Sequence, residues 1–95
     1  MKLKSITKAN DGKHKLKAVF IKPGGKTKTT RFGAVGYSDF TQHHDEERKT
    51  RYIKRHRARE NFNDPTTAGS LSRYILWNKK TIGASISDFK NKFNL

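Results

Sequence analysis

Apolar and polar positions alternate along residues 14–21, which is the two-residue period of a β-strand with one buried face. The pattern places Leu16, Ala18 and Phe20 on one face and Lys15 and Lys17 on the other. We therefore expect a strand whose apolar face contributes to the core and whose basic face meets solvent.

Turn sequences flank this strand on both sides. Asn-Asp-Gly occupies residues 10–12 and Pro-Gly-Gly occupies residues 23–25, and Asn, Asp and Gly tolerate the positive φ angles of tight turns. Residues 26–32 are rich in β-branched threonine, which favours a strand, and their charged side chains suit the edge of a sheet. The first 32 residues are predicted to form a three-stranded antiparallel meander.

The period becomes helical after a loop that contains two glycines. Residues 45–60 hold neither Gly nor Pro. The first turn holds Asp45, Glu46 and Glu47, and the last turns hold Arg55, Arg57 and Arg59, as the helix dipole favours. Two more helices are predicted over about residues 67–77 and 85–93, the last with Ser85 as its N-cap. The expected parts are a β-meander over 1–32, a Gly-rich loop over 33–44 and a helical part over 45–95. Apolar residues at helical spacing are expected to complete the core: Leu71, Tyr74, Ile75, Trp77, Ile82, Ile86, Phe89 and Phe93. The fold class is thus a single small α+β domain, a three-stranded antiparallel sheet followed by three helices.

Composition narrows the function classes. The chain of 95 residues has 22 Lys and Arg against 8 Asp and Glu, a net charge of +14, and only 32% of its residues are hydrophobic. Ten aromatic residues and only two prolines nevertheless indicate a folded domain. Because there is no cysteine, disulfides and thiolate zinc sites are excluded. The longest apolar run covers residues 18–21, and the first residues lack an apolar stretch, so we expect neither a membrane span nor a secretory signal.

The predicted helix over residues 45–60 carries the strongest functional signal. At about 100° per residue, Arg48, Arg51, Arg55 and Arg59 fall within an arc of about 80°. Arginines spaced about one turn apart match a row of phosphates, which guanidinium groups bind in a bidentate manner. Lys54 and Arg57 add charge to the same helix. A solvated face is the alternative, but residues 1–60 hold 17 basic and 6 acidic residues, an imbalance that favours binding of a polyanion.

Lysines of the predicted sheet extend this basic region. The expected nucleic-acid contacts here are Lys15, Lys17, Lys26 and Lys28, with Lys13 beside them. Residues of one parity project from the same face of a strand, so these lysines would form a basic strip. Protection of the sheet edge is an equally good explanation for them.

The loop and the histidines offer weaker candidates. Tyr37 and Phe40 are either lids on the core or platforms for stacking bases, and we favour the core for both. His43, His44, Asp45 and His56 are residue types that bind metals. Adjacent loop residues do not point to one place, so no metal site and no cofactor are expected.

One stretch of the chain resembles a known family. Its residues are Phe32-Gly-Ala-Val-Gly-Tyr-Ser-Asp-Phe-Thr, His44, Asp45, Arg48-Lys49, Tyr52-Ile53, Arg55-His56, Leu76-Trp77-Asn78-Lys79 and the segment 85–93. The stretch resembles small, basic, functionally uncharacterised proteins of large DNA viruses of eukaryotes, over roughly residues 26–95. The resemblance implies a viral source, with a location in the virion and the infected host cell, and leaves the chemistry open.

These observations lead to a non-catalytic function. We expect a protein that binds nucleic acid, DNA rather than RNA, irrespective of base sequence, in viral genome packaging or as a virion accessory protein. The alternative is a structural virion or interaction protein whose basic face docks an acidic protein partner or an anionic surface. A metal-dependent nuclease is a third reading. Because apolar residues are few, a homodimer that gains core by association is also possible.

Overall fold

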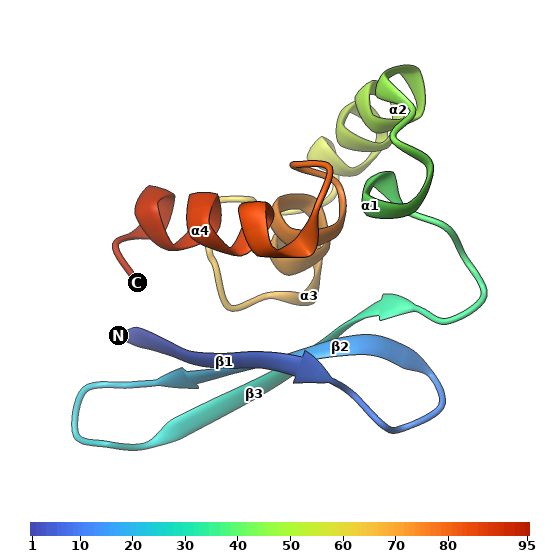
Figure 1. Ribbon diagram of the computed structural model, residues 1–95. Helices are drawn as coiled ribbons and strands as arrows, with labels where there is room; N and C mark the ends of the chain where they lie inside the picture. The colour runs from blue at the N-terminus through green and yellow to red at the C-terminus, as the bar shows by residue number, and fades with distance from the viewer.

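The computed structural model describes all residues, 1–95, and confirms the predicted α+β architecture (Figure 1). In chain order the elements are β1 (Lys2–Lys8), β2 (His14–Ile21), β3 (Thr27–Ala34), α1 (Phe40–His43), α2 (Glu46–Arg57), α3 (Ala68–Leu71), the π-helical turn η1 (Ser72–Leu76) and α4 (Ile82–Phe93). No helix combines the length and the apolar character that a membrane crossing requires.

The sheet is the predicted antiparallel meander, in the order β1-β2-β3. The β1–β2 turn forms where expected, because Asn10 and Gly12 adopt positive φ angles and the Asp11 carboxylate accepts hydrogen bonds from the backbone amides of Lys13 and His14. These hydrogen bonds, that of the His14 amide above all, lower the pKa of Asp11 well below its usual value. The Asp11 carboxylate that fixes the turn is therefore ionised at neutral pH.

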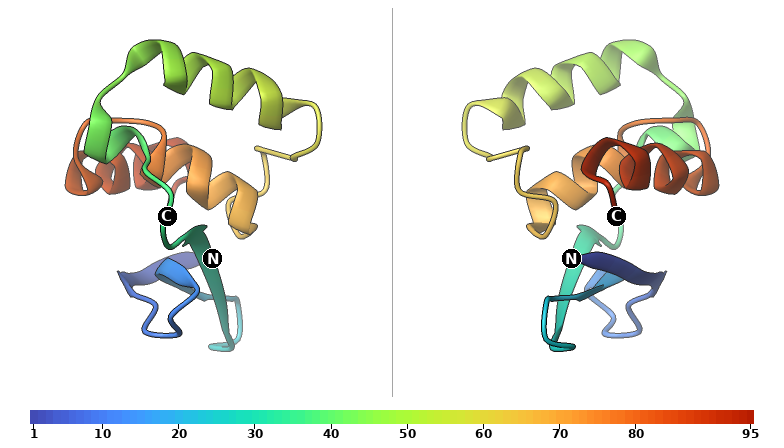
Figure 2. Two further views of the ribbon diagram at one scale, coloured as in Figure 1. Left: turned by 90° about the vertical axis from the view of Figure 1, so that its right-hand side faces the viewer. Right: turned by 90° about the vertical axis from the view of Figure 1, so that its left-hand side faces the viewer.

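The helices all lie on one face of the sheet, and Figure 2 shows them stacked in two levels above it. α3, η1 and α4 pack next to the sheet, and α2 lies outermost, farthest from the strands (Figures 1 and 2). The buried core between the sheet and the first helical level consists of Ala18, Phe20, Phe32, Leu71, Ile75, Leu76 and Phe89. Sheet and helices thus share one core, and α2 is added to its outside.

Side-chain caps fix the starts of the helices. Asp39 caps α1 through the Thr41 amide, and Asp45 caps α2 through the amides of Glu47 and Arg48. Each carboxylate satisfies amides that have no partner within the helix.

Several predicted boundaries need correction. The loop over 33–44 contains the end of β3 and the additional short helix α1, and α2 ends at Arg57, so Arg59 lies in the turn that follows. α4 begins at Ile82 with Thr81 as its N-cap, whereas Ser85 is buried and its hydroxyl accepts a hydrogen bond from the Lys79 amide. Ile82 itself is exposed and does not belong to the core.

Candidate nucleic-acid interface

α2 is held to the molecule by a few contacts on one face and buries none of its residues completely. The Tyr52 ring stacks on the Trp77 ring, with centroids 4.2 Å apart and planes inclined by 5°. The Lys49 ammonium group donates a hydrogen bond to the backbone carbonyl of Asn78 at 2.6 Å. The remaining faces of the helix are open to solvent, where its arginines lie.

Two histidine rings extend the Tyr52–Trp77 pair into a longer aromatic stack. His56 lies on the other side of Tyr52, 4.1 Å away, and His43 lies beside Trp77 at 5.3 Å. Burial raises the pKa of Tyr52 to about 12, so its phenol is neutral at physiological pH. Tyr52 and His56 are both half-buried, so they form the inward arc of this helix.

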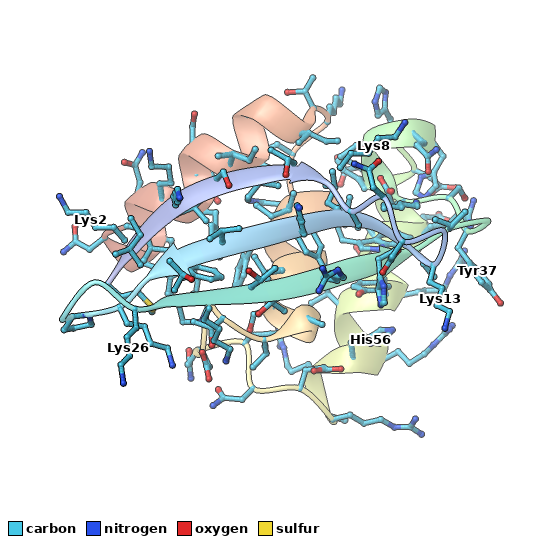
Figure 3. All side chains as sticks on the ribbon, turned by 90° about the horizontal axis from the view of Figure 1, so that it is seen from below. Lys2, Lys8, Lys13, Lys26, Tyr37 and His56 are labelled. Atoms are coloured by element: carbon cyan, nitrogen blue, oxygen red, sulfur yellow. The ribbon has the colours of Figure 1, made fainter.

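A cleft of about 500 Å³ opens beside this stack, and we call it the basic cleft. α2 forms one wall, the loop after β3 forms the opposite wall, and η1 with Trp77 forms the floor. The lining residues are Lys15, Gly33, Ala34, Tyr37, Ser38, Asp39, Arg48, Arg51, Tyr52, Arg55, His56, Ser72, Leu76 and Trp77. Figure 3 shows Tyr37 and His56 at the same end of the molecule, with Lys26 at the opposite end.

Three of the predicted arginines, Arg48, Arg51 and Arg55, line the basic cleft together. All three are exposed, and none forms an ion pair. The one hydrogen bond from this group runs from the Arg48 guanidinium to the Ser38 hydroxyl at 3.4 Å. Three guanidinium groups that line one cleft without ion-pair partners are available to bind an anion.

The single acidic residue of the cleft, Asp39, does not neutralise them. Its buried carboxylate accepts hydrogen bonds from the Lys15 ammonium group at 2.6 Å and from the amide and hydroxyl of Thr41. Lys15 also donates to Gln42. Lys15 and Asp39 neutralise each other, so the positive charge of the cleft comes from the arginines.

This pairing corrects the predicted strip of strand lysines. Lys15 reaches Asp39, and Lys28 donates to the Thr66 hydroxyl at 3.0 Å, so both are tied to the helical half. Lys17 is half-buried on β2, and Lys26 is exposed in the β2–β3 turn. The four lysines therefore do not form one surface.

The other predicted basic residues lie around α2 rather than in the cleft. Lys54 and Arg57 are exposed on α2 but do not line the cleft, and Arg59 follows the helix end. The structure thus keeps three members of the predicted arginine row together and separates the fourth.

Tyr37 is the cleft residue whose role was misjudged from the sequence. It is 74% exposed on the wall opposite α2, whereas Phe40, three residues later, is fully buried as expected. Gly33 lies near the end of β3, just before the loop that carries Tyr37, and has a φ of +78° that a residue with a side chain rarely adopts. A Cβ atom at Gly33 would lie 2.7 Å from the Leu76 side chain, so glycine lets this wall of the cleft approach its floor.

His43 and His44 take part in packing and in the end of a helix. His43 packs between Phe40 and Trp77, and its Nδ1 accepts a hydrogen bond from the Asp45 amide. His44 adopts a left-handed conformation at the end of α1. No three His, Cys, Asp or Glu residues converge as a group that would hold a metal ion.

A family model described as a family of unknown function, DUF5754, matches residues 4–56, which is more than half of the chain. The chain belongs to this family. No curated protein and no solved structure matches the chain.

The part of the chain that matches DUF5754 includes the sheet from residue 4 onward, α1, and α2 as far as His56. It therefore contains the three cleft arginines and Tyr37, whereas Trp77 and the rest of the cleft floor come from residues beyond the match. The family description names no chemistry and no source, so the viral origin implied by the resemblance stays a prediction.

Proposed function

We propose that this protein is a non-catalytic nucleic-acid-binding protein that holds DNA by its phosphates through α2, irrespective of base sequence. The observation that carries the proposal is the row of cleft arginines, Arg48, Arg51 and Arg55, exposed on the outermost helix without a carboxylate partner. Genome packaging or an accessory role in a virion is the setting we propose for this activity, on the strength of the resemblance alone.

The spacing of the row fits a nucleic-acid backbone. At 1.5 Å per residue, Arg48 and Arg55 lie about 10 Å apart along the helix axis. One DNA strand presents a phosphate about every 3.4 Å along its axis, so this length faces about three phosphates. Three guanidinium groups therefore match about three phosphates. Phosphate contacts position a protein on DNA without reading its sequence, which is the reason for expecting no base preference.

The salt dependence of binding tests the proposal. Three neutralised phosphates predict a slope of about −2.7 for the logarithm of the binding constant against the logarithm of salt concentration. A fourfold rise in salt should then weaken binding about 40-fold, as measured by fluorescence anisotropy with a labelled duplex. The double variant Arg51→Gln, Arg55→Gln should lower the slope by about 1.8.

The matched control removes the same charge elsewhere. Lys22 and Lys26 lie in the β2–β3 turn, and Lys26 appears at the far end of the molecule from the cleft residues (Figure 3). The variant Lys22→Gln, Lys26→Gln should keep a slope within a few tenths of the wild-type value. Equal losses in the two double variants would show that binding depends on net charge alone and would refute the assignment to α2.

The second candidate function is docking of an acidic protein or an anionic surface. The exposure of Lys54 and Arg57 outside the cleft favours it, because a broad basic surface suits a broad anionic one. Competition at physiological salt separates the two functions: an acidic polypeptide that displaces DNA at equal charge concentration would support docking.

Association into a homodimer stays a prediction, which sedimentation of the free protein would test.

A further inference from the structure

The basic cleft has the size and chemistry of a small-ligand site, in addition to its position on the proposed DNA-binding helix. Its volume of about 500 Å³ falls within the range of about 300–1,000 Å³ that small-molecule sites occupy. An intact duplex is much too wide to enter it, whereas a single nucleotide is of the right order of size. The α2 surface and the interior of the cleft can therefore select different forms of a nucleic acid.

The two walls of the cleft differ in chemistry. The α2 wall presents the guanidinium groups of Arg48, Arg51 and Arg55, which suit phosphate oxygens. The opposite wall presents Tyr37, whose ring is 74% exposed and takes part in none of the aromatic pairs or side-chain hydrogen bonds of the structure. An exposed aromatic ring in the same cleft as a row of cations suits an unpaired nucleotide, since the base can stack while its phosphate is neutralised.

The floor supplies a second apolar surface. Trp77 and Leu76 line it, and Trp77 is held in place by the stack with Tyr52. Asp39 brings the one carboxylate, and it is occupied by Lys15 and Thr41, so it does not repel an incoming phosphate as a free carboxylate would. The cleft thus combines positive charge, an aromatic surface and a volume large enough for a nucleotide.

We propose that the basic cleft binds one unpaired nucleotide of a nucleic-acid strand, with its phosphates against Arg48, Arg51 and Arg55 and its base against Tyr37. The inference rests on the proposed function, since the same arginines contact the backbone, and it adds a preference. Single-stranded or frayed DNA binds more tightly than a blunt duplex with the same number of phosphates.

The variant Tyr37→Ala tests this preference, because it removes the stacking ring without changing charge and without touching the core. One stacked base contributes about 5- to 150-fold in affinity. We expect the variant to bind a short oligothymidine strand more weakly by that factor. Its affinity for a blunt duplex should stay within about twofold of the wild type, and its salt slope should stay the same. Val35→Ala is the matched control, since Val35 is exposed in the same loop and does not line the cleft.

Trp77 gives an independent readout as the only tryptophan of the chain. A base that enters the cleft should quench its fluorescence, so the single strand should quench more strongly than the blunt duplex at equal saturation. A free nucleoside monophosphate that quenches Trp77 in the wild type and not in Tyr37→Ala would identify the same site with a free ligand.

The outcomes separate this inference from the proposed function. Equal affinity of wild type and Tyr37→Ala for the single strand, with no quenching of Trp77, would overturn the nucleotide site even if the arginine variants still lower the salt slope. Inorganic phosphate that competes as well as the nucleotide would also overturn it, because the base would then contribute nothing. Loss of salt dependence from the arginine variants is needed for the proposed function and does not by itself support the cleft.

Discussion

The attachment of α2 through Tyr52 leads to a quantitative prediction for the variant Tyr52→Ala. The substitution removes a ring that is half-buried and stacked in parallel on Trp77. Truncation of a fully buried aromatic side chain to alanine costs about 3–5 kcal/mol. A half-buried ring loses about half of that, and the aromatic pair contributes about 0.5–1.5 kcal/mol more. We therefore expect a loss of about 2–4 kcal/mol.

This loss should fall on α2 and leave the rest of the molecule folded. The helix has 12 residues and no fully buried side chain, and isolated helices of this length are marginal in water. The core between the sheet, η1 and α4 contains no residue of α2. Amides in the middle of α2 should therefore exchange with solvent about 30- to 900-fold faster, while β2 amides keep their wild-type rates.

Hydrogen exchange followed by mass spectrometry or NMR measures both regions at once. Tyr52→Phe keeps the stacked ring and should retain wild-type protection, and Lys54→Ala controls for a substitution on the exposed face of the same helix. Faster exchange by the same factor in β2 and α2 would refute the reasoning, since it would make α2 part of the cooperative core. Unchanged α2 protection would show that Lys49 and the loops hold the helix without Tyr52.

Three further predictions concern the cleft and its supports. Lys15→Met leaves the buried Asp39 carboxylate without its cation and should cost about 1.5–3 kcal/mol in denaturant unfolding; a smaller loss would mean that Thr41 alone satisfies the carboxylate. Gly33→Ala places a Cβ atom against Leu76 at a positive φ and should cost about 1–3 kcal/mol, measured in the same way, with a wild-type melting temperature as the contrary result. Because burial raises the pKa of Tyr52 to about 12, folding favours its neutral phenol, so its contribution to stability is complete below pH 10 and is lost as the pH rises from 10 towards 12. The protection factors of α2 amides, which correct for the base-catalysed intrinsic exchange rate, should fall in that window in the wild type and not in Tyr52→Phe.

The sheet followed from the sequence because its signals are local. Alternation along β2 depends only on the two-residue period, and the β1–β2 turn depends on residues that tolerate positive φ, as Asn10 and Gly12 do. The body of α2 was likewise predictable from its acidic start and basic end. Each of these features is decided by neighbours in the chain.

The start of α4 shows where local reasoning fails. Ser85 and Asp88 have the spacing of a capping box, and Gly83 argues against an earlier start. The structure instead caps the helix with Thr81, whose hydroxyl accepts from the Ala84 amide. Ser85 is needed elsewhere, since its buried hydroxyl satisfies the Lys79 amide. The tertiary use of a side chain decided between two caps that look alike in sequence.

The basic cleft depends on tertiary structure even more than the start of α4 does. The sequence placed Arg48, Arg51 and Arg55 on one arc of a helix, but the surfaces opposite them come from residues before and after that helix. Trp77, expected in the core on helical spacing, packs against the core but is only half-buried. The wide turn η1 explains the difference: its π-helical hydrogen bonds, which end with the Trp77 amide donating to the Ser72 carbonyl at 3.0 Å, place Leu76 in the core and turn Trp77 towards α2. Since the residues of a π-turn have no distinctive sequence pattern, the floor of the cleft, and with it a place for a base beside the arginines, is visible only in the folded chain.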